Sequence, residues 1–176
     1  MMIKREITHE QKKFLEKIAE EIDICKISTT YGSDRNHSVK TGTRDQRGAR
    51  QDVVGLLSNG NSSWHSACHQ KHPQLMRMCR KFMKMHHPDM QFKTVYINVN
   101  TICQPHLDRK NSGESLIVGF GDYKGGQTNI FVMQKDGSFK KQQYDISKFS
   151  LSFDGSKVIH SSSEFVGNRY SLVFFN

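Results

Sequence analysis

Near the middle of the chain, His106-Leu107-Asp108 could offer two ligands to one metal ion. Side chains at positions i and i+2 of an extended segment point the same way, so the imidazole and the carboxylate would converge. The pair is a weak signal alone, because about one His-x-Asp or His-x-Glu is expected by chance in a chain with 9 His and 17 acidic residues. A second pair, His87-Pro88-Asp89, is expected to mark the end of a helix. The segments around each pair must therefore decide which of the two pairs is the better candidate for metal binding.

The context favours His106 and Asp108, because they directly follow an alternating segment, residues 92–100, at the position of a barrel mouth. His160, at the end of a later predicted strand, would supply a third ligand. Two histidines and one carboxylate form the facial ligand set of non-haem Fe(II) oxygenases, which leaves three octahedral positions open. Arg169 opens the last predicted strand, where burying a cation is costly unless it meets an anion. A bidentate arginine suits a co-substrate that carries a carboxylate.

The strands that must position these residues begin near residue 92, where the apolar pattern changes from helical to alternating. Between Phe92 and Asn100, three apolar side chains alternate with three polar ones, Tyr96, Asn98 and Asn100. Further strands are predicted at Ser115–Phe120, Thr128–Met133, Phe139–Tyr144, Phe149–Phe153, Lys157–His160 and Arg169–Phe175. Glycine- and aspartate-rich turns at residues 121–126, 135–137, 154–155 and 167–168 separate them. Several short strands at this spacing indicate a sandwich or a barrel.

Two amphipathic helices are predicted before these strands. Thr8-x-x-Gln11 resembles a capping box, and apolar residues then recur at helical spacing through Ile22. The second helix follows Pro73 and ends before Pro88. We therefore expect an α+β protein with a mainly β core and N-terminal helices packed outside the sheet.

Residues 28–63 have a different composition, rich in Ser, Thr, Gly, Asn and Arg. Only Val53–Leu57 resembles buried structure, and the rest is predicted to be a long loop of the kind that is functional or disordered. Basic residues are spaced along it at Arg35, Lys40, Arg44, Arg47 and Arg50. The loop is a candidate substrate-facing element, and a solvated loop is the alternative.

The length of 176 residues leaves room for one domain, and the net charge of +9 suits a partner that carries phosphates. No apolar run approaches the roughly 20 residues of a membrane span, and Met1–Glu6 lacks the apolar stretch of a secretory signal. We therefore expect an intracellular protein. Its four cysteines, Cys25, Cys68, Cys79 and Cys103, show no paired spacing and are expected to be reduced.

A second metal hypothesis concerns His65-x-x-Cys68-His69-x-x-His72, because histidine and cysteine are zinc ligands. The spacing matches no four-ligand pattern well, and the stretch leads directly into the second predicted helix. Ordinary packing is therefore favoured over zinc binding.

His106-x-Asp108, the distal His160 and Arg169 together resemble the 2-oxoglutarate/Fe(II)-dependent dioxygenase superfamily, which is built on a double-stranded β-helix (jelly roll). The resemblance covers roughly residues 92–176. Within that superfamily, the ending Asn-Arg-Tyr-Ser-Leu-Val-Phe-Phe at residues 168–175 is similar to the final core strand of the TET/JBP group of nucleic-acid methylpyrimidine hydroxylases. Asn111, five positions after His106, is similar to that group as well.

The resemblance implies a single dioxygenase domain over residues 1–176, with a helical and loop-rich support region at 1–91 and a core β-helix at 92–176. Fe(II) would be held by His106, Asp108 and His160, which with Arg169 form the catalytic set. The co-substrates would be 2-oxoglutarate and O2. Arg169 would bind the far carboxylate of 2-oxoglutarate, together with Ser171 or with a polar residue among Tyr96, Asn98 and Asn100.

The implied reaction hydroxylates the methyl group of 5-methylcytosine or thymine in nucleic acid, with release of succinate and CO2. Such a base would be flipped out of a duplex or single-stranded. We expect nucleic acid as the partner, DNA rather than RNA, with no membrane, no partner protein and a monomeric chain. The substrate-binding candidates are Asn111, Arg109, Arg44, Arg47 and Arg50, although Asn111 is equally explained by a turn. A prolyl or other protein side-chain hydroxylase and a non-catalytic nucleic-acid-binding module are the alternatives.

Overall fold

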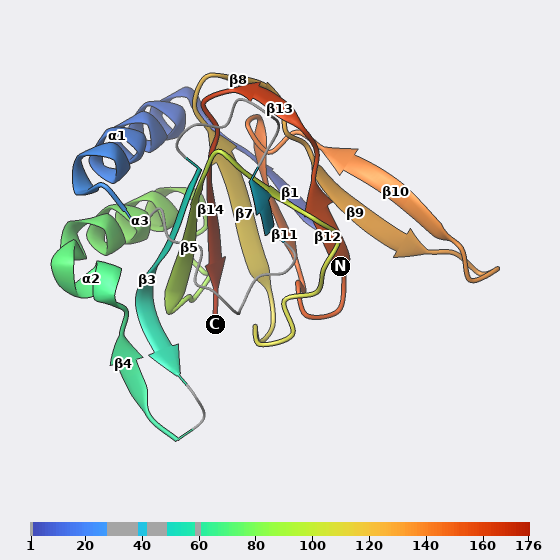
Figure 1. Cartoon of the computed structure of the whole chain (residues 1–176), viewed down its shortest axis with the longest axis horizontal. Helices are drawn as coiled ribbons and strands as arrows, with labels where there is room; N and C mark the ends of the chain where they lie inside the picture. Colours follow the sequence, from blue (N-terminus) through green and yellow to red (C-terminus); the bar gives the residue numbers. More distant parts are fainter. Residues whose placement is uncertain (1, 28–38, 42–48, 59–60) are drawn as a thin grey trace.

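The computed structural model describes residues 2–27, 39–41, 49–58 and 61–176 (Figure 1). Within these ranges the main sheet has seven strands in the order β1-β11-β7-β14-β5-β3-β4, and a smaller sheet has the order β10-β9-β12. Two further pairs, β13-β8 and β2-β6, connect them, and all the pairings are antiparallel. The strands are β1 Ile3–Glu6, β2 Val39–Thr41, β3 Arg50–Ser58, β4 Ser63–His65, β5 Thr94–Val99, β6 Thr101–Cys103, β7 Ser115–Phe120, β8 Tyr123–Gly125, β9 Thr128–Met133, β10 Phe139–Tyr144, β11 Phe149–Phe153, β12 Ile159–Ser162, β13 Phe165–Gly167 and β14 Tyr170–Phe175.

Three helices, α1 (His9–Cys25), α2 (Ala67–Lys71) and α3 (Pro73–His86), cover one face of the main sheet (Figure 1). The predicted capping box is confirmed, because the Thr8 hydroxyl accepts a hydrogen bond from the Gln11 N–H and the Thr8 N–H donates to the Gln11 side chain. The short helix α2 was not predicted. In the described part of the chain, no helix is both long enough and apolar enough to cross a membrane.

Strands β5 and β14 separate the core from the pocket, because their side chains alternate between the two faces. Leu172 and Phe174 of β14 join Val95 and Ile97 of β5 in the large core beneath α1 and α3. The opposite face of the same strands carries Ser171 and other residues that line the pocket. The alternation expected from the sequence is therefore confirmed for β5, and β14 has the same pattern.

The N-terminal region contributes more strand than we expected. The composition of residues 28–63 predicts a long loop around the buried segment Val53–Leu57, but β3 extends over nine residues and pairs with β5 and β4. Polar side chains interrupt the apolar pattern of β3. One of them, Gln51, donates a hydrogen bond to Asn98 of the neighbouring strand. Residues 121–126 and 167–168, predicted as turns, contain all of β8 and the last residue of β13. Such short glycine-containing strands carry almost no periodic signal.

A buried histidine joins the helices to the main sheet. The His86 ring at the end of α3 contacts the Gln11 side-chain oxygen at 3.0 Å and the Ser150 hydroxyl of β11 at 2.7 Å. Because Gln11 offers only a carbonyl oxygen, Nδ1 donates and Nε2 accepts from Ser150, which is the arrangement of a neutral ring. Burial, with smaller contributions from the charges of Arg5 and His87, lowers the pKa of His86 to about 4.

We expect His86 to make the stability of the fold pH-dependent. Below about pH 6.5 the unfolded chain protonates His86 while the folded chain does not, so the free energy of unfolding decreases as pH falls towards about 4, by up to about 1.4 kcal/mol per pH unit. In His86→Gln this contribution is absent. We expect urea unfolding between pH 7 and about 4.5 to give a larger free energy of unfolding for the natural chain than for His86→Gln at pH 7. This difference in free energy should become smaller as pH falls. A constant difference would contradict a neutral buried His86.

Candidate metal centre

The fold brings together the three residues that the sequence singles out. His106 lies on the extended segment after β6, Asp108 follows two residues later, and His160 lies on β12. The backbone N–H of each histidine donates to the carbonyl of the other, at 3.0 and 3.1 Å, which fixes the two segments side by side. The possible ligand atoms of the three residues all lie within 4.8 Å of one another.

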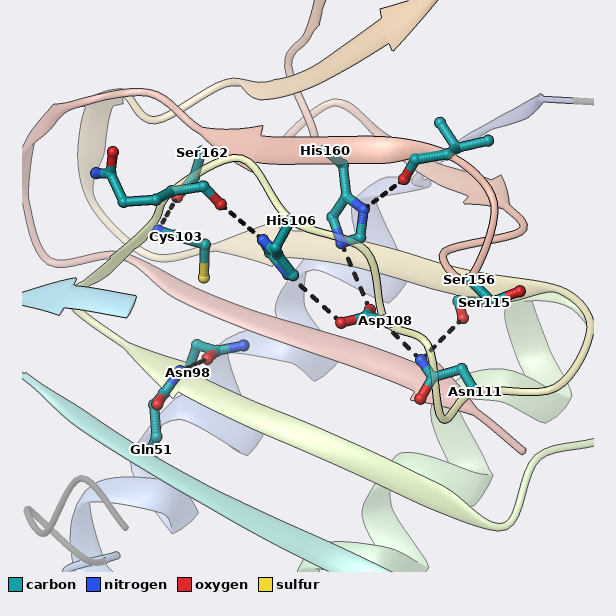
Figure 2. Close-up of polar contacts among 12 residues, drawn as sticks. Gln51, Asn98, Cys103, His106, Asp108, Asn111, Ser115, Ser156, His160 and Ser162 are labelled. Carbon is teal, nitrogen blue, oxygen red and sulfur yellow. Dashed lines mark hydrogen bonds and ion pairs between the residues drawn. The ribbon is translucent and has the colours of Figure 1, made fainter. Parts of the chain in front are cut away.

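Both imidazoles are held in the orientation that a metal ligand requires. Nδ1 of His106 lies 2.7 Å from the carbonyl of Gln104, and Nδ1 of His160 lies 2.9 Å from the carbonyl of Val158 (Figure 2). Because a carbonyl only accepts hydrogen bonds, each Nδ1 carries its proton and each Nε2 is the available ligand atom. The two Nε2 atoms approach opposite oxygens of Asp108, each at 3.4 Å.

The carboxylate of Asp108 is kept in its charged form. Burial alone would raise its pKa, but hydrogen bonds and charge from His106 and His160 outweigh burial and hold the pKa of Asp108 below its usual range. The backbone also fixes this residue, since the Asp108 N–H donates to the carbonyl of Gly155 at 2.8 Å. A Cβ atom at Gly155 would lie 3.2 Å from the Asp108 carboxylate, so only glycine leaves the carboxylate undisturbed.

These ligand atoms open into a cavity of about 150 Å³ that extends to Arg169. Its walls come from the inner faces of β5 and β14 on one side and of β9 and β12 on the other. The lining residues are Gln51, Tyr96, Asn98, Thr101, Cys103, His106, Asp108, Asn111, Ile117, Thr128, His160, Ser161, Ser162, Arg169, Ser171, Val173 and Phe175.

Arg169 is a buried cation at the deep end of this cavity, with 2% of its surface exposed. Its Nε donates to the carbonyl of Gly126 at 3.2 Å, and the guanidinium carbon lies 5.6 Å from the Tyr123 ring centre. No carboxylate among the described residues forms an ion pair with it. Since a buried charge without a counter-ion is costly, an anionic ligand fits this end of the cavity.

Two buried hydroxyls in the cavity wall also lack partners. The Oγ1 atoms of Thr101 and Thr128 line the cavity and make no hydrogen bond. Buried polar groups are nearly always paired in native proteins, so these hydroxyls are available to the oxygens of a bound ligand. The sequence does not indicate Thr101 or Thr128, because a threonine in a strand is ordinary until the fold places it in the wall of a cavity.

Three of the four predicted co-substrate residues besides Arg169 line the cavity: Ser171, Tyr96 and Asn98. Figure 2 shows Asn98 beneath the metal ligands, where its side-chain oxygen accepts from Gln51 at 2.6 Å. Asn100 does not line the cavity. It has a left-handed backbone, with φ of 52°, and its side-chain oxygen accepts from the Arg169 backbone N–H at 2.7 Å. Asn100 therefore supports the arginine from behind.

The predicted substrate-binding residues lie in different places. Asn111 lines the cavity and its amide contacts the Asp108 carboxylate at 3.4 Å, and Arg109 is exposed on the same loop. Arg50 instead forms an ion pair with Asp23 of α1. Because the next residue, Gln51, faces the cavity, Arg50 points to the helical face and not to the site. Arg44 and Arg47 lie outside the described residues.

Neither alternative metal motif forms a site in the described chain, where the His106, Asp108 and His160 group is the one cluster of its kind. His87 follows the end of α3, as expected for a helix terminus. Around the suggested zinc motif, the rings of His65 and His69 stack with centres 4.3 Å apart, and Cys68 is buried.

No protein-family model matches the sequence, and no curated protein matches it either. Solved structures do match. NgTET1 in complex with 5mC DNA has a TM-score of 0.58 at 14% identity, over 99% of this chain and 71% of that one. A Pseudomonas putida prolyl-4-hydroxylase has a TM-score of 0.54 at 12% identity, over 99% and 91%. A 2OG-Fe(II) oxygenase family protein from Burkholderia pseudomallei has a TM-score of 0.56 at 11% identity, over 89% and 77%.

At these identities the likeness establishes the fold. The predicted architecture, a double-stranded β-helix with helices outside the sheet, is confirmed. The His106, Asp108 and His160 group lies within this fold as a candidate site for a metal ion.

Divalent-ion binding is the direct prediction of this geometry. In a Co(II) titration followed by absorbance, His106→Ala and Asp108→Ala should each lose most of the binding, because two ligands hold the ion much less firmly than three. The control His87→Ala, in the other His-x-Asp motif, should bind as the natural chain does. Far-ultraviolet circular dichroism should remain unchanged in all three. Loss of binding in His87→Ala alone would contradict the choice of motif.

Proposed function

We propose that the chain is an Fe(II)- and 2-oxoglutarate-dependent oxygenase that hydroxylates the methyl group of a methylated pyrimidine, 5-methylcytosine or thymine, in nucleic acid, with release of succinate and CO2. One observation carries the chemistry: a single cavity joins the His-Asp-His group to a buried arginine without a counter-ion. Residues 1–176 would act as one domain, because β1 and β3 from the region 1–91 complete the sheet formed by 92–176.

His106, Asp108 and His160 would be the metal ligands. Two neutral imidazoles and one carboxylate on a single face suit Fe(II), which when bound supplies the activation of O2 that organic side chains cannot perform. The carbonyls of Gln104 and Val158 keep each Nε2 directed at the ion. Hydrogen bonds to Asp108 and the Gln104 carbonyl raise the pKa of His106 against the effect of burial, so a bound ion would compete with a proton for its Nε2 atom.

Arg169 would bind the far carboxylate of 2-oxoglutarate, with the unpaired hydroxyls of Thr101 and Thr128 as additional donors. Ser171 of β14 is buried two residues after Arg169 and lines the same cavity, and it would complete this end. The keto-acid end of the co-substrate would then face the three metal ligands along the cavity. Because Arg169 is buried, water screens its charge less than it screens a charge at the surface.

A nucleic-acid substrate is supported by the net charge of +9 and by the likeness to NgTET1 in complex with 5mC DNA. Exposed basic residues, Lys93, Arg109 and Lys110, also lie next to residues that line the cavity. Apolar side chains of Ile117, Val173 and Phe175 in the cavity wall suit a methyl-bearing base. Such a base could reach this depth only when flipped out or single-stranded.

A protein side-chain hydroxylase is the second candidate. It is supported by the likeness to prolyl hydroxylases, one of them in complex with a peptide fragment of hypoxia inducible factor. One fold supports several substrates, so the substrate must be decided by experiment. A non-catalytic binding module is less well supported, because the chain has the three candidate metal ligands at one end of the cavity and Arg169 at the other.

Arg169→Ala should raise the KM for 2-oxoglutarate roughly 150- to 5000-fold, since breaking a buried charge pair costs about 3–5 kcal/mol. Arg169→Lys should recover only part of this loss, because a point charge does not reproduce a two-pronged contact. Succinate formation measured against 2-oxoglutarate concentration tests both, with the exposed Arg109→Ala as the control. An unchanged KM in Arg169→Ala would remove Arg169 from the co-substrate site.

The substrate is tested by incubating the protein with Fe(II), 2-oxoglutarate and methylated DNA, methylated RNA or a proline-containing peptide panel. We expect mass spectrometry of the nucleosides to detect hydroxymethylated pyrimidine, and Asp108→Ala to abolish it. Hydroxylated peptide without oxidised nucleoside would establish the second candidate. Absence of succinate under every condition would reject the oxygenase itself.

A further inference from the structure

The cavity opens at one end of the main sheet. Along the pocket-facing side of β14, Arg169 and Ser171 are buried, whereas Val173 and Phe175 are partly exposed. Asp108 and Asn111 are also partly exposed, and their loop is tied to this end because the Ser112 N–H donates to the carbonyl of Asn176. The mouth therefore lies at the C-terminal end of β14.

A hairpin formed by β3 and β4 extends past the main sheet at this same end (Figure 1). Phe175 at the mouth lies opposite Thr94 of β5, which in turn lies opposite Gly55 of β3. Strand β3 continues beyond Gly55 to Ser58 and pairs there with β4. The hairpin thus projects beyond the level of the mouth.

The hairpin carries Trp64, the single tryptophan of the chain, with 43% of its surface exposed. Trp64 lies opposite Leu57, which is two residues past Gly55, so Trp64 is about 7 Å beyond the end of β5 along the strand direction. Because β4 is three strands away from β14 in the sheet, Trp64 is also about 14 Å to the side of β14. Within the described ranges, no other ring or cation stacks on it. An unstacked aromatic at such a position is available to a ligand that extends out of the mouth.

One basic residue, Lys93, borders the path between this ring and the cavity, and two more lie on the loop that leads into β7. Lys93 is exposed, and its backbone connects β14 to β3. Its N–H donates to the Phe175 carbonyl, and its carbonyl accepts from the Leu56 N–H. Arg109 and Lys110 are exposed on the loop that follows Asp108. Cations that contact a phosphate backbone, together with an aromatic platform for a base, are the combination by which proteins bind single-stranded nucleic acid.

We propose that Trp64 stacks on a base that flanks the target nucleotide of a single-stranded or locally unpaired nucleic acid. The inference rests on the proposed function and deepens it, because it defines the substrate as an unpaired strand that extends from the cavity along Lys93 to the hairpin. A stacked tryptophan would add affinity for any base sequence, since every base offers a flat aromatic face.

The single tryptophan makes this directly measurable in the full chain, because all tryptophan emission comes from Trp64. Titration with single-stranded oligothymidine and with single-stranded DNA containing 5-methylcytosine should quench the emission, and added salt should weaken the binding. A fully paired duplex of the same sequence should quench less at equal concentration. Unchanged emission at saturating single strand would overturn the stacking contact.

Binding of fluorescently labelled single strand should weaken roughly 5- to 150-fold in Trp64→Ala, the range expected for loss of one stacked base. Trp64→Phe should retain most of the affinity. Phe139→Ala is the matched control, because Phe139 is also an exposed aromatic, 52% exposed, on a hairpin strand of the smaller sheet, and it should bind as the natural chain does. Substrate-independent succinate formation should be equal in all of these variants.

The results separate this inference from the proposed function. If nucleosides are oxidised but Trp64→Ala binds and turns over like the natural chain, the stacking platform is wrong and the oxygenase stands. If no succinate forms, yet single strand quenches Trp64 and Trp64→Ala binds weakly, the platform stands and the oxygenase is wrong. Quenching by a hydroxylated peptide and not by single strand would overturn the inference in favour of a protein substrate.

Discussion

The backbone pairing between His106 and His160 is the interaction on which the site depends. These residues are far apart in the sequence, and their two reciprocal hydrogen bonds belong to a longer contact between the same segments. The Cys103 N–H donates to the Ser162 side chain on one side, and the Asp108 N–H donates to the Gly155 carbonyl on the other. All three candidate ligands are therefore positioned by main-chain contacts, before any ion contributes.

The opposite end of the cavity is set by the cost of burying Arg169. Its backbone is held by Asn100, its Nε by the carbonyl of Gly126, and its guanidinium lies near the faces of Tyr123 and Phe165. None of these groups neutralises the charge. The surrounding structure thus fixes the position of a cation whose counter-ion must come from outside the described chain, which is a strong preference for an anionic ligand.

The features that were predictable from the sequence are those with local patterns. The capping box of α1, the alternation of β5 and β14 and the pairing of His106 with Asp108 all depend on neighbours within a few residues. Thr101 and Thr128 could not be found in this way, because an unpaired hydroxyl is defined by what surrounds it in the fold. The same reason accounts for Asn100 and Arg50, whose partners Arg169 and Asp23 come from distant elements.

The two cores of the molecule are unequal, and the cavity lies between them. The larger one, beneath α1 and α3, supports β14 and Arg169, whereas the smaller one, around Ile130 and Phe153, supports β12 and His160. A ligand that contacts both Arg169 and an ion on His160 would therefore link the layer with the larger core to the layer with the smaller core. Separation of the smaller sheet from the main sheet would remove His160 from the ion. A bound metal ion and co-substrate would then stabilise the layer that holds them, so that the free energy needed to open this layer would increase with occupancy of the site.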